Sequence, residues 1–168
     1  MLSANNIVVP ENGLVGRYNL PSRYPVIAKP RRGQGSKGIQ KVDSISILKS
    51  LKNEYVWQEY LIPENEEYTC SVYVAKDLSF RVLVIKRLLI CGYTDRGLVI
   101  NDPQINSYVE NIVKAFNKSG LYNIQLRLTS QGPKLFEVNP RLSGTLVFRD
   151  KLGFHDLRWW LSESLNIK

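Results

Sequence analysis

Apolar residues recur along the chain in two kinds of pattern. In some segments they occupy every second position, as in strands, and in others every third or fourth position, as in helices. In the first third of the chain, two strand-like segments flank residues 30–38, which are rich in glycine and positive charge. A short helical pattern follows, with Asp43 or Ser44 as its possible N-cap, and then another strand pattern. The expected order is therefore strand, loop, strand, helix and strand, over residues 25–29, 30–38, 39–42, 45–51 and 55–60.

The helices predicted in the rest of the chain have clear starting signals. Asp102 followed by Pro103 is a strong helix start, and apolar residues then keep helical spacing as far as Phe116. Gly120 stands where a left-handed helix terminator is expected. A last helix is predicted from about Asp156, and its large apolar residues are expected in the core: Trp159, Trp160 and Leu161.

These patterns predict an α+β protein with two lobes. We divide the chain at Leu61, into a smaller lobe of residues 1–61 and a larger lobe of residues 62–168. β-Branched and aromatic residues mark the strands of the larger lobe, and the last two strands read as a hairpin with a turn over residues 129–133. The expected strands cover residues 67–75, 80–90, 122–128 and 134–139.

Composition places the chain among globular proteins. Its hydrophobic fraction is 43% and its charged fraction is 23%, which argues against disorder and against a coiled coil. No apolar run approaches the roughly 18 residues of a membrane-spanning helix, and the N-terminus does not have the pattern of a signal peptide. A cytoplasmic location is therefore expected, with Cys70 and Cys91 as buried, reduced structural thiols.

The net charge of +8 implies an anionic partner, and nucleic acid and nucleotide phosphate both fit. Aromatic residues are not interleaved with the basic residues as they are in nucleic-acid stacking platforms, which disfavours nucleic acid. Lys86 and Arg96 are further possible anion contacts, whereas the single histidine, His155, is expected to be structural or exposed. Five of the basic residues fall in one short segment: Lys29, Arg31, Arg32, Lys37 and Lys41.

That segment contains a G-x-G-x-x-G pattern over residues 33–38. A dinucleotide fingerprint requires a helix after the last glycine, but the residues after Gly38 alternate like a strand. A phosphate-binding loop of the P-loop type is excluded as well, because Lys followed by Ser or Thr is missing. Two readings stay open: a glycine flap whose backbone N–H groups approach phosphate, with Lys29 beside it, or a flexible hairpin with a basic tip.

The predicted hairpin has a polar face. Alternate residues of a strand share a face, so Gln125 lies with Arg127, and Glu137 lies with Asn139. A turn centred on Gln131 would place Gln125 opposite Glu137. The same register would place Leu126 opposite Phe136, with Phe136 and Val138 behind the polar face.

Carboxylate and amide oxygens without Cys or His suit a hard cation such as Mg²⁺. Arg141, just past the second strand, could pair with a transferring phosphoryl group. The alternative is an ordinary half-exposed polar hairpin face. Upstream, backbone groups at residues 58–61 could read an adenine edge and Glu67 could accept hydrogen bonds from ribose, although an edge strand with a charged turn would look the same.

Together these segments resemble the ATP-grasp superfamily, and most closely its carbamoyl-phosphate-synthase-like branch of amino-acid ligases. Residues 137–144 match the signature Glu-x-Asn-Pro-Arg-x-Ser-Gly. The likeness extends from about Ile7 to Trp160, and the order and spacing of six segments make it far more specific than any one of them. The matching segments are residues 24–30, 35–38, 58–61, 67–69, 123–127 and 136–145.

The resemblance implies an ATP-grasp fold of two α+β lobes with ATP and Mg²⁺ between them. Its reaction is attack of a carboxylate on the γ-phosphate, followed by displacement of phosphate by an amine or another nucleophile. Arg141 is implied to stabilise the phosphoryl group. The implied ligands are Lys29, Gly35, Ser36, Lys37 and Gly38 for phosphate, Glu59, Tyr60 and Leu61 for adenine, Glu67 for ribose, and Gln125, Glu137 and Asn139 for magnesium.

The chain departs from the family pattern at its N-terminus. Family members carry a Rossmann-like domain and a further basic ATP-binding residue upstream of the part matched here, and neither lies within this sequence. We therefore expect a missing N-terminal domain or a partner chain, and a homo-oligomer is a further alternative. The main hypothesis is the catalytic core of an ATP-dependent ligase; the alternative is a truncated, non-catalytic ATP-binding module that works with a partner chain.

Overall fold

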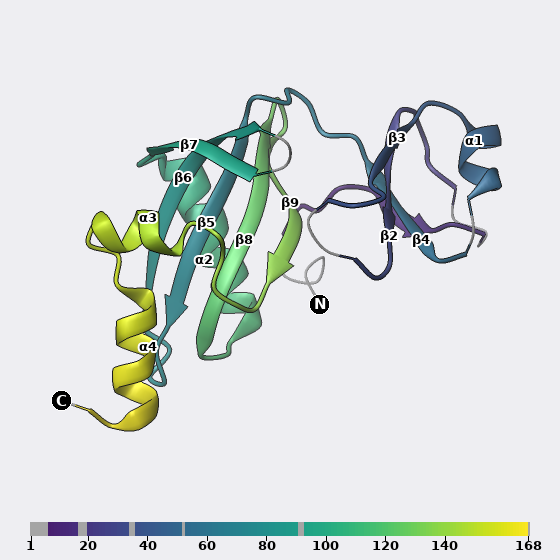
Figure 1. The fold of residues 1–168 in the computed structure, drawn as a ribbon. Coiled ribbons are helices and arrows are strands. Elements are labelled where there is room, and N and C mark those ends of the chain that lie inside the picture. Colours follow the sequence, from purple (N-terminus) through teal and green to yellow (C-terminus); the bar gives the residue numbers. More distant parts are fainter. Residues whose placement is uncertain (1–6, 17–19, 34–35, 52, 91–92, 168) are drawn as a thin grey trace. The chain divides into compact units, whose positions relative to one another are not determined.

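The computed structural model describes residues 7–16, 20–33, 36–51, 53–90 and 93–167. The chain folds into two compact units (Figure 1): unit 1 consists of Met1–Val9 with Ile62–Lys168, and unit 2 of Pro10–Leu61. Unit 2 ends at the residue where we divided the sequence. The stretch before Pro10 belongs to unit 1, because Ile7 is buried in the core of that unit and the Tyr108 hydroxyl donates to the backbone oxygen of Val8.

Unit 2 is a four-stranded antiparallel sheet with strand order β1-β4-β2-β3 and one short helix. Ser44 caps the helix by accepting from the backbone N–H of Ile47 at 3.4 Å. The small core consists of Val15, Val26, Ala28, Val42, Leu48 and Trp57. The elements are β1 (Asn12–Leu14), β2 (Val26–Pro30), β3 (Gln40–Val42), α1 (Ile45–Ser50) and β4 (Tyr55–Glu59).

Unit 1 is a five-stranded antiparallel sheet with strand order β7-β6-β5-β8-β9 and three helices. Within the described residues, every helix is too short or too polar to cross a lipid bilayer. The strands are β5 (Glu67–Val74), β6 (Phe80–Ile90), β7 (Tyr93–Val99), β8 (Gly120–Thr129) and β9 (Gly132–Asn139). The helices are α2 (Pro103–Phe116), α3 (Leu146–Lys151) and α4 (Asp156–Leu165).

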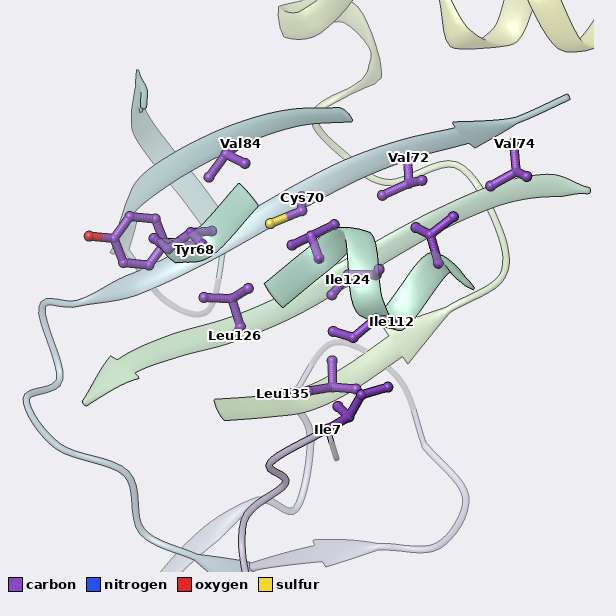
Figure 2. Packing of buried hydrophobic residues seen from close by; sticks show 13 residues of the cluster. Ile7, Tyr68, Cys70, Val72, Val74, Val84, Ile112, Ile124, Leu126 and Leu135 are labelled. Atoms are coloured by element: carbon purple, nitrogen blue, oxygen red, sulfur yellow. The ribbon is translucent and has the colours of Figure 1, made fainter. Parts of the chain in front are cut away.

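The core of unit 1 lies between α2 and one face of the sheet. Asp102 caps α2 by accepting from the backbone N–H groups of Gln104 and Ile105 at 2.8 and 3.0 Å. Figure 2 shows the side chains that fill this core, several of which come from alternate positions of β5 and β8, with others from α2 and the neighbouring strands. The buried residues include Tyr68, Cys70, Val72, Val74, Ile124, Leu126, Ile105, Val109, Ile112 and Val113.

The sequence-based predictions about these elements are wrong or incomplete in three respects. Helix α2 ends at Asn117, in the left-handed conformation with φ 47°, and Gly120 instead begins β8. Asn tolerates this conformation well enough to replace glycine. In α4, Trp160 and Leu161 are 38% and 39% exposed, so of the three residues expected in the core only Trp159 packs inward, on Tyr73 and Phe154. Two strands and a helix were not predicted from the sequence: β1, β7 and α3.

The β8–β9 hairpin confirms one predicted pair and corrects another. Gln125 lies opposite Glu137 as predicted, but Leu126 lies opposite Leu135 rather than Phe136. A β-bulge at Phe136 shifts the register between these two pairs. Phe136 is therefore not behind the polar face: its ring lies 6.0 Å from the Arg127 guanidinium, on the polar side.

Candidate active site

The face of the unit 1 sheet that α2 does not cover carries a row of polar side chains. Strand β5 is buried at every position, yet the odd-numbered residues in its N-terminal half, 67, 69 and 71, are polar. Their neighbours on β8 are polar too, and Thr69 donates to Asn123 at 2.7 Å. The buried members of the row are Glu67, Thr69, Ser71, Asn123 and Gln125, each at most 9% exposed. Buried polar groups need partners, and Glu67, Gln125 and the Thr69–Asn123 pair have them, whereas the Ser71 hydroxyl has none among the residues that the structure describes.

The three residues predicted to bind a cation meet at the end of this row. The Gln125 side-chain amide donates to Glu137 Oε1 at 3.1 Å, and the Asn139 amide donates to the same oxygen at 2.6 Å. Gln125 is buried, Asn139 is half-buried and Glu137 is exposed. Among the described residues, no group of three or more His, Cys, Asp or Glu could hold a metal, so a cation here would depend on one carboxylate and two amides.

A second group of charged residues adjoins this set and is centred on Glu67. Its carboxylate accepts from Arg87 of β6 and from Arg127 of β8, both with side chains 14% exposed. The Arg87 guanidinium also donates to Gln125 Oε1 at 2.6 Å. The structure therefore places Glu67, the predicted ribose ligand, beside two arginines and next to the predicted cation ligands. Sequence reasoning did not select Arg87; its only signal was its odd-numbered position on β6.

The segment after β9 is held in place by a buried ion pair. Arg149 is 1% exposed and contacts Asp156 Oδ2 through Nε at 2.9 Å and Nη2 at 2.8 Å. Its Nη1 donates to the hydroxyls of Ser143 and Thr145 at 2.9 and 3.2 Å. Two residues of the predicted signature region therefore have a structural contact. Arg141 is exposed, and its Nη1 donates to the backbone oxygen of Leu142 at 3.0 Å.

In unit 2, the predicted adenine segment and Lys29 lie on adjacent strands. Lys29 Nζ donates to Gln58 Oε1 at 2.7 Å. Glu59 pairs with Arg23, and its backbone N–H donates to the Glu11 carbonyl at 2.7 Å. Lys41 Nζ lies 4.4 Å from the centre of the Tyr60 ring, whereas Leu61 is buried.

Two predicted ligands in the glycine segment, Gly38 and Ser36, have a backbone conformation that favours glycine. Gly38 has φ +76°, and a Cβ there would stand 2.9 Å from Pro30 Cγ, so a side chain would be strained. Ser36 has φ 59°, and both Ser36 and Lys37 are exposed. Gly35 lies outside the described residues.

The remaining sequence candidates have local partners. Lys86 pairs with Glu66, and the hydrogen bonds from Lys86 and then from Tyr68 lower the pKa of Glu66. Arg96 Nε lies 3.4 Å from Asp95 Oδ2.

His155 is half-buried, and its Nδ1 lies 2.7 Å from Asp150 Oδ1, in agreement with a structural role. Cys70 is fully buried, which raises the pKa of its thiol to about 12; Cys91 lies outside the described residues.

Residues of β6 and β7 line an open depression of about 340 Å³ in unit 1. Lys86 and Leu88 of β6 lie opposite Leu98 and Arg96 of β7 in the ladder, so these side chains share a face. Leu88 and Leu98 are 56% and 64% exposed. This is the face to which Val82 and Val84 belong, which pack in the core beneath α2, but Arg87, whose side chain contacts the polar row, also lines the depression.

Solved structures share this arrangement of sheets and helices. The carboxyaminoimidazole ribonucleotide synthase of Aspergillus clavatus, complexed with ATP, is similar over 94% of this chain and 48% of its own, with a TM-score of 0.72 and 14% identity. The D-alanine–D-alanine ligase of Bacillus anthracis, also complexed with ATP, is similar over 99% of this chain and 63% of its own, with a TM-score of 0.66 and 21% identity. The fold is therefore the ATP-grasp fold, as predicted.

The sequence narrows this class to one family. Residues 52–165 match the family described as ATP-grasp in the biosynthetic pathway with Ter operon, and the chain belongs to that family. It is also 31% identical over 140 residues to the D-alanine–D-alanine ligase of Petrotoga mobilis, a match that covers 74% of this chain and 45% of the relative. The chain thus spans about half the length of these relatives. Its assignment to the carbamoyl-phosphate-synthase-like branch stays a prediction.

Proposed function

We propose that this chain binds ATP with Mg²⁺ and forms the catalytic core of an ATP-dependent carboxylate–amine ligase that works through an acyl phosphate. The observation that carries the proposal is the convergence of Gln125 and Asn139 on one oxygen of Glu137, in a chain of an ATP-grasp family. The relative from Petrotoga mobilis is named as a ligase that joins two amino acids, which supports the same class of reaction.

The donor chemistry of these three residues fits magnesium. A carboxylate and two amides supply only oxygen ligands once the amide oxygens face the ion, and Mg²⁺ usually completes its octahedron with phosphate oxygens and water. The ion, when bound, would neutralise charge on the phosphates during transfer. Glu137 supplies the one carboxylate of these three residues and is exposed, so it is the main ligand in this proposal.

The other residues take roles around the nucleotide. In the proposal, the positive charge of Arg141 stabilises the transferring phosphoryl group, and Glu67 accepts hydrogen bonds from the ribose hydroxyls. The carboxylate substrate attacks the γ-phosphorus of ATP, the bond to the bridging oxygen breaks and ADP leaves; an amine then attacks the carbonyl carbon of the acyl phosphate and displaces phosphate. The phosphate ligands are Lys29, Gly35, Ser36, Lys37 and Gly38, and the adenine contacts come from the backbone of residues 59–61.

Calorimetric titration with ADP tests the binding part of this proposal. We expect saturable binding of ADP that is tighter in Mg²⁺ than in EDTA. In Glu137→Ala or Asn139→Ala, the factor by which Mg²⁺ tightens binding should fall at least tenfold, which corresponds to about 1.4 kcal/mol. Glu110→Ala is the matched control, because Glu110 is an exposed carboxylate on α2 whose one ion pair with a described residue is with Lys114. No saturation at millimolar ADP, or a Glu137→Ala variant that equals wild type, would refute the proposal.

Phosphate release tests the catalytic part. ATP is incubated with the chain and candidate amino acids, and we expect release that depends on both the amino acid and Arg141. Binding of ADP without any phosphate release would favour the alternative, a non-catalytic ATP-binding module that works with a partner chain. An additional domain or partner belongs to the proposal in either case, since the ligase relatives extend beyond the matched part.

A further inference from the structure

Arg87 joins two parts of the polar face that the sequence treats as separate. Its Nε donates to Glu67 Oε1 at 3.0 Å, and its Nη2 donates to both Glu67 Oε1 and Gln125 Oε1, the latter at 2.6 Å. The side chain is only 14% exposed, so the guanidinium has little freedom to turn away. A planar group with several fixed donors can bridge two acceptors in this way, whereas a lysine ammonium is a single point charge.

This bridge determines which end of the Gln125 amide faces Glu137. An amide side chain has one oxygen and one NH₂ group. Because the oxygen accepts from Arg87, the NH₂ group turns toward Glu137 and donates to Oε1 at 3.1 Å. Asn139 donates to the same oxygen at 2.6 Å. One oxygen of Glu137 is thereby held by two donors, and Oε2 has no hydrogen-bond partner among the residues that the structure describes.

We propose that Arg87 is a positioning residue for the cation site: it orients Gln125, Gln125 orients Glu137, and Glu137 presents Oε2 to the cation. The inference rests on the proposed function, since it assumes that the cation binds at Glu137. This inference gives Gln125 a different role from the one in the proposed function: Arg87 holds its amide oxygen, so Gln125 acts on the cation through its hydrogen bond to Glu137 and not as a direct ligand. Residues that orient metal ligands in this way typically change metal affinity by about 10- to 100-fold when they are replaced.

The sign of the effect separates positioning from simple charge. Arg87 is a cation close to the proposed cation site, so electrostatics alone predict that its removal tightens binding of Mg²⁺. Positioning predicts the opposite, because Glu137 loses the donor that fixes its carboxylate. Arg87→Lys sharpens the distinction, since it keeps the charge and loses the bridge between Glu67 and Gln125.

The experiment measures the dissociation constant of ADP in EDTA and in Mg²⁺ by calorimetry. The quantity compared among variants is the constant in EDTA divided by the constant in Mg²⁺, which is larger when Mg²⁺ strengthens binding more. Association of ADP with Mg²⁺ in solution is the same for every variant, so a change in the ratio belongs to the protein. We expect Arg87→Met to lower the ratio about tenfold, with Arg87→Lys and Gln125→Met lowering it as well. Arg87→Met combined with Gln125→Met should lower it no further than either alone, because the two residues act in one chain of contacts.

Arg81→Met is the matched control. Arg81 lies on the same strand and the same face as Arg87, but its guanidinium stacks 4.4 Å from the Trp159 ring. Its ratio should equal that of wild type. Thermal unfolding of each variant confirms that the measured protein is folded, and if Arg87→Met does not fold, Arg87→Lys and Gln125→Met carry the test.

Two results would overturn the inference. One is an unchanged or higher ratio in Arg87→Lys and Arg87→Met; the other is a double variant whose loss equals the sum of the two single losses. Both leave the proposed function standing, provided that wild-type protein binds ADP better in Mg²⁺. If wild-type protein shows no binding or no effect of Mg²⁺, the proposed function fails and the inference fails with it.

Discussion

At the scale of the residue, Arg149 shows how a buried charge organises the segment after β9. Its guanidinium reaches Asp156 with two nitrogens and the hydroxyls of Ser143 and Thr145 with a third. Both members of the ion pair are almost fully buried, at 1% and 3% exposure of the side chain. Removing water from two charges is costly, and the extra hydroxyl contacts offset part of that cost.

Replacing one partner of this pair should be far more harmful than replacing both. Arg149→Met leaves the Asp156 carboxylate buried without its cation, which should lower the free energy of unfolding by about 3–5 kcal/mol in urea denaturation. Combining it with Asp156→Leu should restore much of that loss. Arg158→Met is the control, because Arg158 is 69% exposed in its contact with Asp150 and should cost less than about 1 kcal/mol. A double variant as unstable as Arg149→Met would contradict this account.

At the scale of the element, the β8–β9 hairpin reached the predicted pairing by a route that the sequence did not predict. The turn consists of two residues, 130 and 131, so Thr129 lies opposite Gly132. A regular ladder from that turn would place Gln125 opposite Phe136. The bulge at Phe136 adds one residue to β9 and brings Glu137 opposite Gln125 instead. The bulge is therefore what aligns the proposed cation ligands.

Helix α2 offers a test of a local signal. Asp102 accepts from two backbone N–H groups at the start of the helix, whose inner residues fill the core of unit 1. Asp102→Ala removes both contacts and should lower the free energy of unfolding by about 1 kcal/mol, measured by urea denaturation. Asp102→Asn keeps a side-chain acceptor and should lose only a few tenths of that amount. Equal losses in the two variants would show that capping is not the cause.

At the scale of the whole molecule, each unit has its own core. Leu48 belongs to the core of unit 2 and Ile112 to that of unit 1, at 2% and 0% exposure. Neither core shares a residue with the other, so a cavity in one should weaken mainly the unit that contains it.

Hydrogen exchange can measure this independence. Leu48→Ala should destabilise unit 2 by about 2–5 kcal/mol and speed exchange of amides in β2 and β4. Exchange in β5 and β8 should stay near the wild-type rate, and Ile112→Ala should show the reverse pattern. Faster exchange throughout the chain in both variants would mean that the two units unfold together.

The sequence by itself determined much of the local structure and the family. Periodicity predicted most strands and helix α2, because the side chains of a strand alternate between faces and those of a helix recur every three to four residues. The same reasoning placed Gln125 with Glu137, and the signature over residues 137–144 indicated the ATP-grasp class that the fold and the family match support. Strand β1 escaped because it has only three residues, and β7 escaped because Asp95, Arg96 and Gly97 interrupt the alternation of its seven residues.

Only the tertiary structure decided which side chains from distant strands meet. Arg87 reaches Glu67 and Gln125 because β5 lies between β6 and β8 in the sheet, and the order of strands is not a local property of the sequence. Arg149 lies on α3 and Asp156 begins α4, so their ion pair depends on how the two helices pack, and the bulge at Phe136 is a feature of the pairing of β9 with β8. A period reports the face on which a residue lies, whereas its partners depend on contacts between segments far apart in the chain.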